Sequence, residues 1–154
     1  MKFDYLRDTQ EHVTNEAVAN SATRIVPPGS VLVVVKSKIL ARTLPVAIAE
    51  VHVCFGQDLK AIICGERLAS EYLASLLRGS AKMIIAQARG LNTEGLTLEI
   101  LGRVSAPVPP LALQREFARR VKQLRAIAAR QAESGERLEA LSRSLTERAF
   151  NGEI

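Results

Sequence analysis

Charged residues in the middle of the chain have a spacing compatible with a metal-dependent active site. Glu50 is followed along the chain by the run Asp58-Leu59-Lys60. Carboxylates on neighbouring strands can hold a divalent cation while a lysine steadies a nucleophilic water, as in metal-dependent nucleases. A pattern with so few fixed positions often arises by chance, and strands commonly carry charges beside a turn. We therefore keep a nuclease that uses Asp58 and Lys60 as an alternative only.

Other catalytic signals are missing from the sequence. It has no Gly-rich phosphate loop, no Gly-x-Ser-x-Gly elbow and no dinucleotide fingerprint. Cys54 and Cys64 lie in apolar runs without a Cys-x-x-Cys pair, and His12 and His52 are isolated. We expect reduced thiols, no metal site, no cofactor bound by this chain and no catalysis by the chain alone.

Cations and amides gather in expected loops. An apolar run of valines and one leucine, 31–35, is followed at once by the segment 36–43, which holds three cations. A loop of this kind is placed to meet a phosphate backbone. The amides of Gln57 and Asn92 suit adenine, and Arg42 or Arg89 suits guanine, although each such residue is more often an ordinary surface residue.

The elements that must position these loops are expected to form a small α+β globule over residues 1–106. A short helix over 15–19 is capped by Thr14. Hydrophobic and turn patterns predict further elements. The expected strands are 31–35, 46–49, 51–55 and 60–64, and the expected helices are 66–78 and 81–88, with a polar turn over 90–95.

The second part of the chain, residues 107–154, reads as one long helix after a proline run. Pro110 fixes its start at Leu111, and no later proline interrupts it before Phe150. Apolar residues recur at steps of four and three, with large and small side chains alternating, as expected for close pairing with another helix. A helix that packs only on its own globule is the alternative. The expected pairing residues are Phe117, Val121, Leu124, Ala128, Gly135, Leu138, Leu141 and Leu145.

Composition narrows the class of partner. The net charge is +5, and most of the excess positive charge lies between Arg115 and Arg130. Such a cluster attracts polyanions, although it is also common on solvated helix faces. Aromatic residues make up 4% of the chain and tryptophan is absent, which disfavours single-strand binding by stacking. No run of about 20 apolar residues and no secretory signal is present, so we expect a cytoplasmic protein without a membrane partner.

Several segments together resemble the specificity subunits of type I restriction-modification systems. The run 107–115 is similar to the segment that ends a target recognition domain and starts the spacer helix, and 148–154 is similar to the end of that helix. Segments 26–33, 40–47 and 57–61 are similar to the strand-loop-strand core of such domains. Gly56 and Leu113 depart from the family pattern, and the resemblance is to one recognition domain that begins part-way along its length.

The resemblance implies a protein that supplies the DNA address and no chemistry. Family members read a split double-stranded DNA target and dock DNA methyltransferase subunits, which bind S-adenosylmethionine. We expect this chain to read half of such a target and to form a homodimer through antiparallel pairing of 111–150. A relic that only binds partner subunits is the alternative. Loop position and resemblance together give the candidate DNA contacts: Lys36, Ser37, Lys38, Arg42, Gln57, Lys60, Arg89, Asn92 and Thr93.

Overall fold

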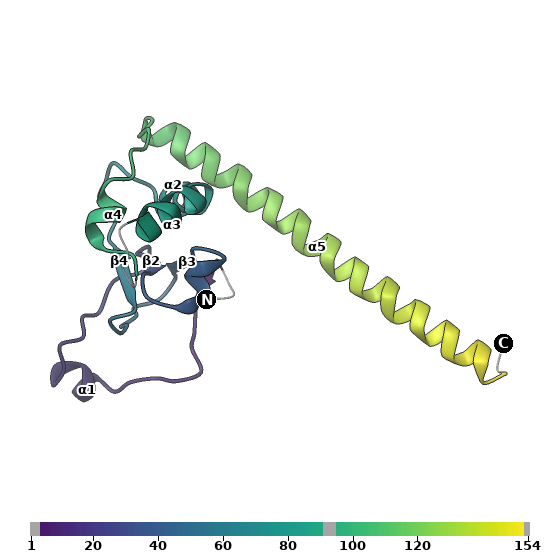
Figure 1. Cartoon of the computed structure of the whole chain (residues 1–154). Coiled ribbons are helices and arrows are strands. Elements are labelled where there is room, and N and C mark those ends of the chain that lie inside the picture. Colours follow the sequence, from purple (N-terminus) through teal and green to yellow (C-terminus); the bar gives the residue numbers. More distant parts are fainter. Residues whose placement is uncertain (1–3, 91–94, 153–154) are drawn as a thin grey trace. The chain divides into compact units, whose positions relative to one another are not determined.

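The α+β class expected from the sequence is confirmed by a computed structural model, which describes residues 4–90 and 95–152 (Figure 1). The chain divides into two compact units, one that ends at Arg115 and one that starts at Glu116. The first unit contains a small sheet with helices. The second unit is the remainder of one long helix.

Four short strands form one sheet in the order β1-β3-β2-β4. Strand β2 is antiparallel to both β3 and β4, whereas β1 is parallel to β3. The register places Val31 of β2 opposite Ile48 of β3 on one side and Ile62 of β4 on the other. The strand bounds are β1 Tyr5–Leu6, β2 Val31–Val34, β3 Val46–Ala49 and β4 Leu59–Ile62.

Both faces of β2 are buried, which explains its unbroken apolar sequence. Val31 and Val33 point into the main core, and Leu32 points into a smaller cluster on the opposite face. The helices α2 (Ser70–Gly79), α3 (Ala81–Gly90) and α4 (Leu98–Gly102) supply the other side of the main core, and Figure 1 shows them grouped over the sheet.

Five expected elements have different bounds or do not form: the strand expected over 31–35 ends at Val34, the helix expected over 81–88 continues to Gly90, and three others differ more. Residues 51–55 are not a strand, because only Val53 pairs, in a single antiparallel bridge with Val26. The helix expected over 66–78 starts at Ser70, since Ala69 is held in an extended conformation with φ −79° and ψ 132°. The last strand spans Leu59–Ile62 and not 60–64. By contrast, helix α1 (Asn15–Ala19) forms as expected, capped by the Thr14 side chain.

Helix α5 spans Leu111–Phe150, with the start and end that were expected. The backbone N–H groups of Leu113 and Gln114 both donate to the Pro110 carbonyl oxygen, which closes its first turn. Its 40 residues correspond to about 60 Å. In the described ranges, no helix combines the length and apolar character needed to span a membrane.

Candidate nucleic-acid interface

Two cationic or amide-bearing loops meet where β2 ends and β4 begins. The backbone N–H groups of Val35 and Lys36 both donate to the Asp58 carbonyl oxygen, at 2.8 and 3.2 Å. This double contact continues the β2–β4 ladder beyond the strands. It brings the exposed side chains of Lys36 and Gln57, which are far apart in sequence, to the same end of the sheet.

The connection from β2 to β3 contains a short 3-10 helix, η1 (Lys38–Ala41). The Ser37 hydroxyl accepts the backbone N–H of Ile39, and the half-buried Leu40 packs on the main core. The loop is therefore anchored from beneath while Lys36, Ser37, Lys38 and Arg42 remain exposed. We call this end of the sheet, defined by residues 35–42 and 56–58, the loop end.

A third segment reaches the loop end through a close backbone approach. The Leu96 N–H donates to the Val35 carbonyl oxygen at 2.7 Å. A Cβ atom on Gly95 would lie 2.6 Å from the same oxygen, so a side chain there would force the segments apart. The expected contacts Asn92 and Thr93 lie outside the described residues. The backbone of Arg89 belongs to α3, but its side chain is not among those that the structure describes.

Lys60 differs from the other expected contacts. It pairs with Val33 across the β2–β4 ladder, so both side chains leave the sheet on the face that the helices cover. Lys60 is half-buried, whereas the three cations and the serine expected as contacts in the β2–β3 connection are exposed. The structure thus brings Lys60 to the sheet edge and not to the exposed tip of a loop.

The arrangement that a nuclease would need is not formed. Glu50 follows β3, where the chain meets the start of β2, and its carboxylate pairs with Arg7. Asp58 lies at the other end of β2, about six residues and hence roughly 20 Å away along the sheet. Among the described residues, no group of three or more His, Cys, Asp or Glu could hold a metal ion.

Gln114 is a residue whose role was not recognised from the sequence. Its side chain is fully buried and makes three hydrogen bonds within the first unit. Oε1 accepts the Ala69 N–H at 2.8 Å, and Nε2 donates to the carbonyl oxygens of Arg67 at 3.0 Å and Pro109 at 2.7 Å. The Tyr72 hydroxyl also donates to the Pro107 carbonyl oxygen, at 2.7 Å. The available signal was a glutamine four residues after the last proline.

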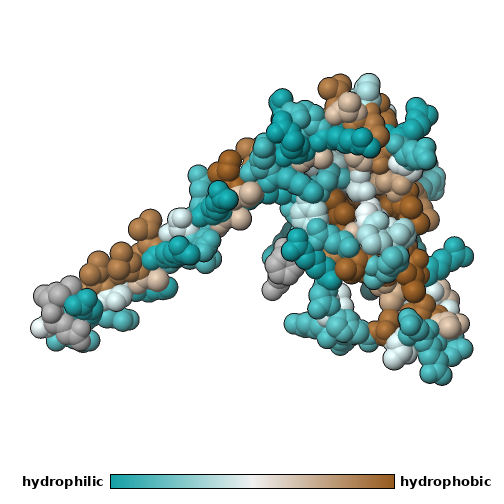
Figure 2. Space-filling model, turned by 180° about the vertical axis from the view of Figure 1, so that it is seen from behind, coloured by the Kyte–Doolittle hydropathy of each residue, from teal (hydrophilic) through white to brown (hydrophobic). Residues whose placement is uncertain are grey.

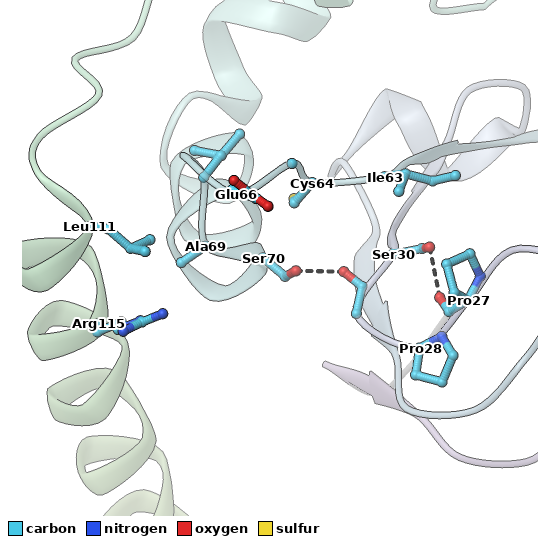
Figure 3. Close-up of a pocket in the computed structure, with 13 residues that line it drawn as sticks. Pro27, Pro28, Ser30, Ile63, Cys64, Glu66, Ala69, Ser70, Leu111 and Arg115 are labelled. Carbon is cyan, nitrogen blue, oxygen red and sulfur yellow. Dashed lines mark hydrogen bonds between the residues drawn. The ribbon is translucent and has the colours of Figure 1, made fainter.

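A pocket of about 380 Å³ lies beside this anchor, at the end of the sheet where β2 starts (Figure 3). In this view the Ser70 hydroxyl points to the Gly29 carbonyl oxygen, to which it donates a hydrogen bond. Leu111 and Arg115 from the first turn of α5 also line the pocket. Burial raises the pKa of the Cys64 thiol in its wall, which disfavours the reactive thiolate form.

Apolar side chains form an exposed stripe on α5, which Figure 2 shows as hydrophobic patches along one side of the helix. Leu124 and Leu138 are each 67% exposed, and Phe117, Ile127, Leu141 and Leu145 are also exposed. Gly135 has open space around it. Monomeric soluble proteins rarely expose contiguous apolar surface of this kind without a partner.

The charged side of α5 begins with a shared carboxylate. Glu116 accepts hydrogen bonds from Arg119 and Arg120, both at 2.8 Å. The pKa of Glu116 is lowered to about 2, mainly by the hydrogen bond from Arg119 and then by the hydrogen bond from Arg120. Arg137 pairs with Glu133 one turn before it in the same way, at 2.6 Å.

Comparison with known proteins agrees with this architecture. Residues 2–140 match the type I restriction modification DNA specificity domain. Over 111 residues, 71% of the chain, the sequence is 31% identical to the specificity subunit of the type I restriction enzyme EcoR124I/EcoR124II from Escherichia coli. The matched part is 28% of that subunit, so the chain spans less than a third of its relative. The extent of the domain match, from before β1 to well inside α5, shows that the chain belongs to the type I restriction-modification DNA specificity family.

Proposed function

We propose that the chain binds double-stranded DNA through the loop end and acts as a sequence-specific recognition subunit. The observation that carries this proposal is the convergence of Lys36, Lys38, Arg42 and Gln57, which lie on two connections but meet at one end of the sheet. Cations and hydroxyls fix a protein on the phosphate backbone, while an amide such as that of Gln57 can read an adenine edge.

Pairing of two chains through α5 is the second part of the proposal. Residues 111–130 hold six cations against one carboxylate, whereas residues 131–150 hold three cations against four carboxylates. A parallel pair would place the two strongly cationic halves together. An antiparallel pair places each cationic half beside the slightly acidic half of its partner, which lowers the repulsion.

A two-fold dimer of this kind would present two copies of the loop end to DNA. Each copy would read one half of a bipartite, symmetric target. The reaction itself we assign to partners: methyltransferase subunits that dock on the dimer and bind S-adenosylmethionine. The family membership and the exposed apolar stripe of α5 support such docking.

DNA binding is tested by fluorescence anisotropy of labelled duplexes at several salt concentrations. If Lys36, Lys38 and Arg42 each neutralise a phosphate, their joint replacement by alanine should lower the slope of log affinity against log salt by about 2.7. Arg143→Ala, in the less cationic half of α5, is the matched control and should leave the slope unchanged. An affinity that does not change with salt in the wild type would refute DNA binding.

Pairing is tested by light scattering of the purified chain and of two variants at Gly135. No atom outside its own helix backbone lies near the Cβ position of this glycine, so a β-carbon meets no obstacle there in the single chain. Gly135→Leu should dissociate the dimer by blocking close approach of two helices, whereas Gly135→Ala should not. A wild-type chain that is monomeric at every concentration would exclude self-pairing. A dimer that captures methyltransferase subunits without binding DNA would identify an assembly protein.

A further inference from the structure

The exposed face of α3 has a composition that differs from the other helices. Among the α-helices of the described ranges, α3 alone has no acidic residue. Its inner face is fixed by the buried Ile84 and Ala88. Its outer face carries Lys82, Met83, Ala86 and Gln87, all of them exposed. The outer face of α3 therefore combines a cation, an amide and two apolar side chains on one contiguous surface.

This face is linked to the loop end by the chain that follows it. Helix α3 ends at Gly90, and Gly95 is already packed against the Val35 carbonyl group. Five residues span at most about 17 Å, so the C-terminal end of α3 lies within that distance of Gly95. A DNA duplex bound at the loop end would therefore extend within reach of α3.

From these observations, and resting on the proposed DNA-binding function, we infer that α3 enters the major groove and that Gln87 determines the preference for one base pair. The major groove is about 12 Å wide and admits a helix, and the ten residues of α3 span about 15 Å. Gln87 can donate to and accept from an adenine edge. Met83 and Ala86 can contact a thymine methyl group, and Lys82 a phosphate.

The chemistry of this face favours DNA over a protein partner. Met83 is 46% exposed, but its neighbours on the face are a small alanine and two polar side chains, which form no continuous apolar strip. Carboxylates, which would be repelled by phosphates, are absent from the helix. Small and unbranched side chains also permit close approach to base edges.

The test is selection of bound duplexes from a random-sequence pool by the full chain and by variants at Gln87. The wild type should select a consensus that contains an adenine at the Gln87 position. Gln87→Leu should weaken that preference at least about tenfold, and Gln87→Arg should replace it with a preference for guanine. Leucine and arginine are helix formers as good as glutamine, so unchanged circular dichroism and thermal unfolding are expected for both variants.

Gln123→Leu, an exposed glutamine in α5, is the matched control and should select the wild-type consensus. If the wild type binds DNA but the Gln87 variants select the same consensus, the inference about α3 is wrong while the proposed function stands. If the Gln87 variants lose capture of a methyltransferase subunit and keep the consensus, α3 is a protein-docking face. A wild type that selects no sequence overturns both proposals.

Discussion

Replacing Gln114 with alanine should destabilise the first unit by about 3 kcal/mol. The fully buried side chain makes three hydrogen bonds, to the Ala69 N–H and to the Arg67 and Pro109 carbonyl oxygens. Each such bond contributes about 1 kcal/mol net, and a buried donor left without an acceptor costs about 1–3 kcal/mol more when water cannot replace the lost partner. Gln114→Glu should be at least as harmful, because it removes both donors and buries a charge against two carbonyl oxygens.

Urea unfolding followed by tyrosine fluorescence measures this effect on the first unit alone. Both tyrosines, Tyr5 and Tyr72, lie in that unit and the chain has no tryptophan. With a urea slope of about 2 kcal/mol/M, a loss of about 3 kcal/mol lowers the midpoint by about 1.5 M. Gln123→Ala, on the exposed surface of α5, is the control and should change stability by less than about 0.5 kcal/mol. A Gln114→Ala midpoint equal to that of this control would refute the anchoring argument.

Further predictions concern the close backbone approach, the charged helix and the half-buried thiol of Cys64. Gly95→Ala should lower the free energy of unfolding, measured by thermal unfolding, by about 1–3 kcal/mol, because its Cβ would lie 2.6 Å from a backbone oxygen. Gly79→Ala, at the open end of α2, should not destabilise the chain. The Glu116 carboxyl should titrate near pH 2 when followed by NMR, and Arg119→Gln should raise the midpoint of this titration. Because the pKa of Glu116 is lowered in the folded chain, its ion pairs stabilise the helix fully above the ordinary pKa of about 4.5. This contribution is lost as the pH falls towards 2. Cys64 should react with iodoacetamide more slowly at pH 8 than a free thiol does, and urea should abolish the difference.

Local signals in the sequence were sufficient where the structure depends on neighbouring residues. The start of α5 follows from Pro110, and the helix ends just before Gly152, which adopts φ +74°. The cap of α1 follows from Thr14 in the same way. The buried strand β2 follows from its unbroken apolar run, because a strand covered on both faces needs no polar alternation.

Long-range contacts decided the elements that the sequence did not predict. Helix α2 starts at Ser70 because the Ala69 N–H is committed to the Gln114 side chain, 45 positions later. Residues 51–55 have strand-like composition, yet only Val53 finds a partner, Val26. The parallel pairing of Tyr5 with Ile48 likewise depends on a distant segment. No local pattern contains this information.

The candidate interface was predictable in part for the same reason. Cationic loops could be named from composition, but their meeting depends on the two hydrogen bonds to the Asp58 carbonyl oxygen. Lys60 was grouped with the loop residues because it follows Gln57 closely, and only the register with Val33 shows that it faces the covered side of the sheet. Position in sequence gave the neighbourhood of each residue but not its direction.

The sheet separates the loop end, for which we propose DNA binding, from the anchor of α5. The anchor at Gln114 contacts Ala69, whose neighbour Ser70 bonds to Gly29 at the start of β2, whereas Lys36 follows the end of β2. Between Gly29 and Lys36 lies the four-residue strand β2, which alone spans roughly 13 Å. Effects of substitutions separated by more than about 10 Å are usually additive. If the loop end binds DNA as we propose, substitutions there should change the DNA sequence that is bound without disturbing the start of α5, because the intervening strand is buried on both faces and separates the two ends.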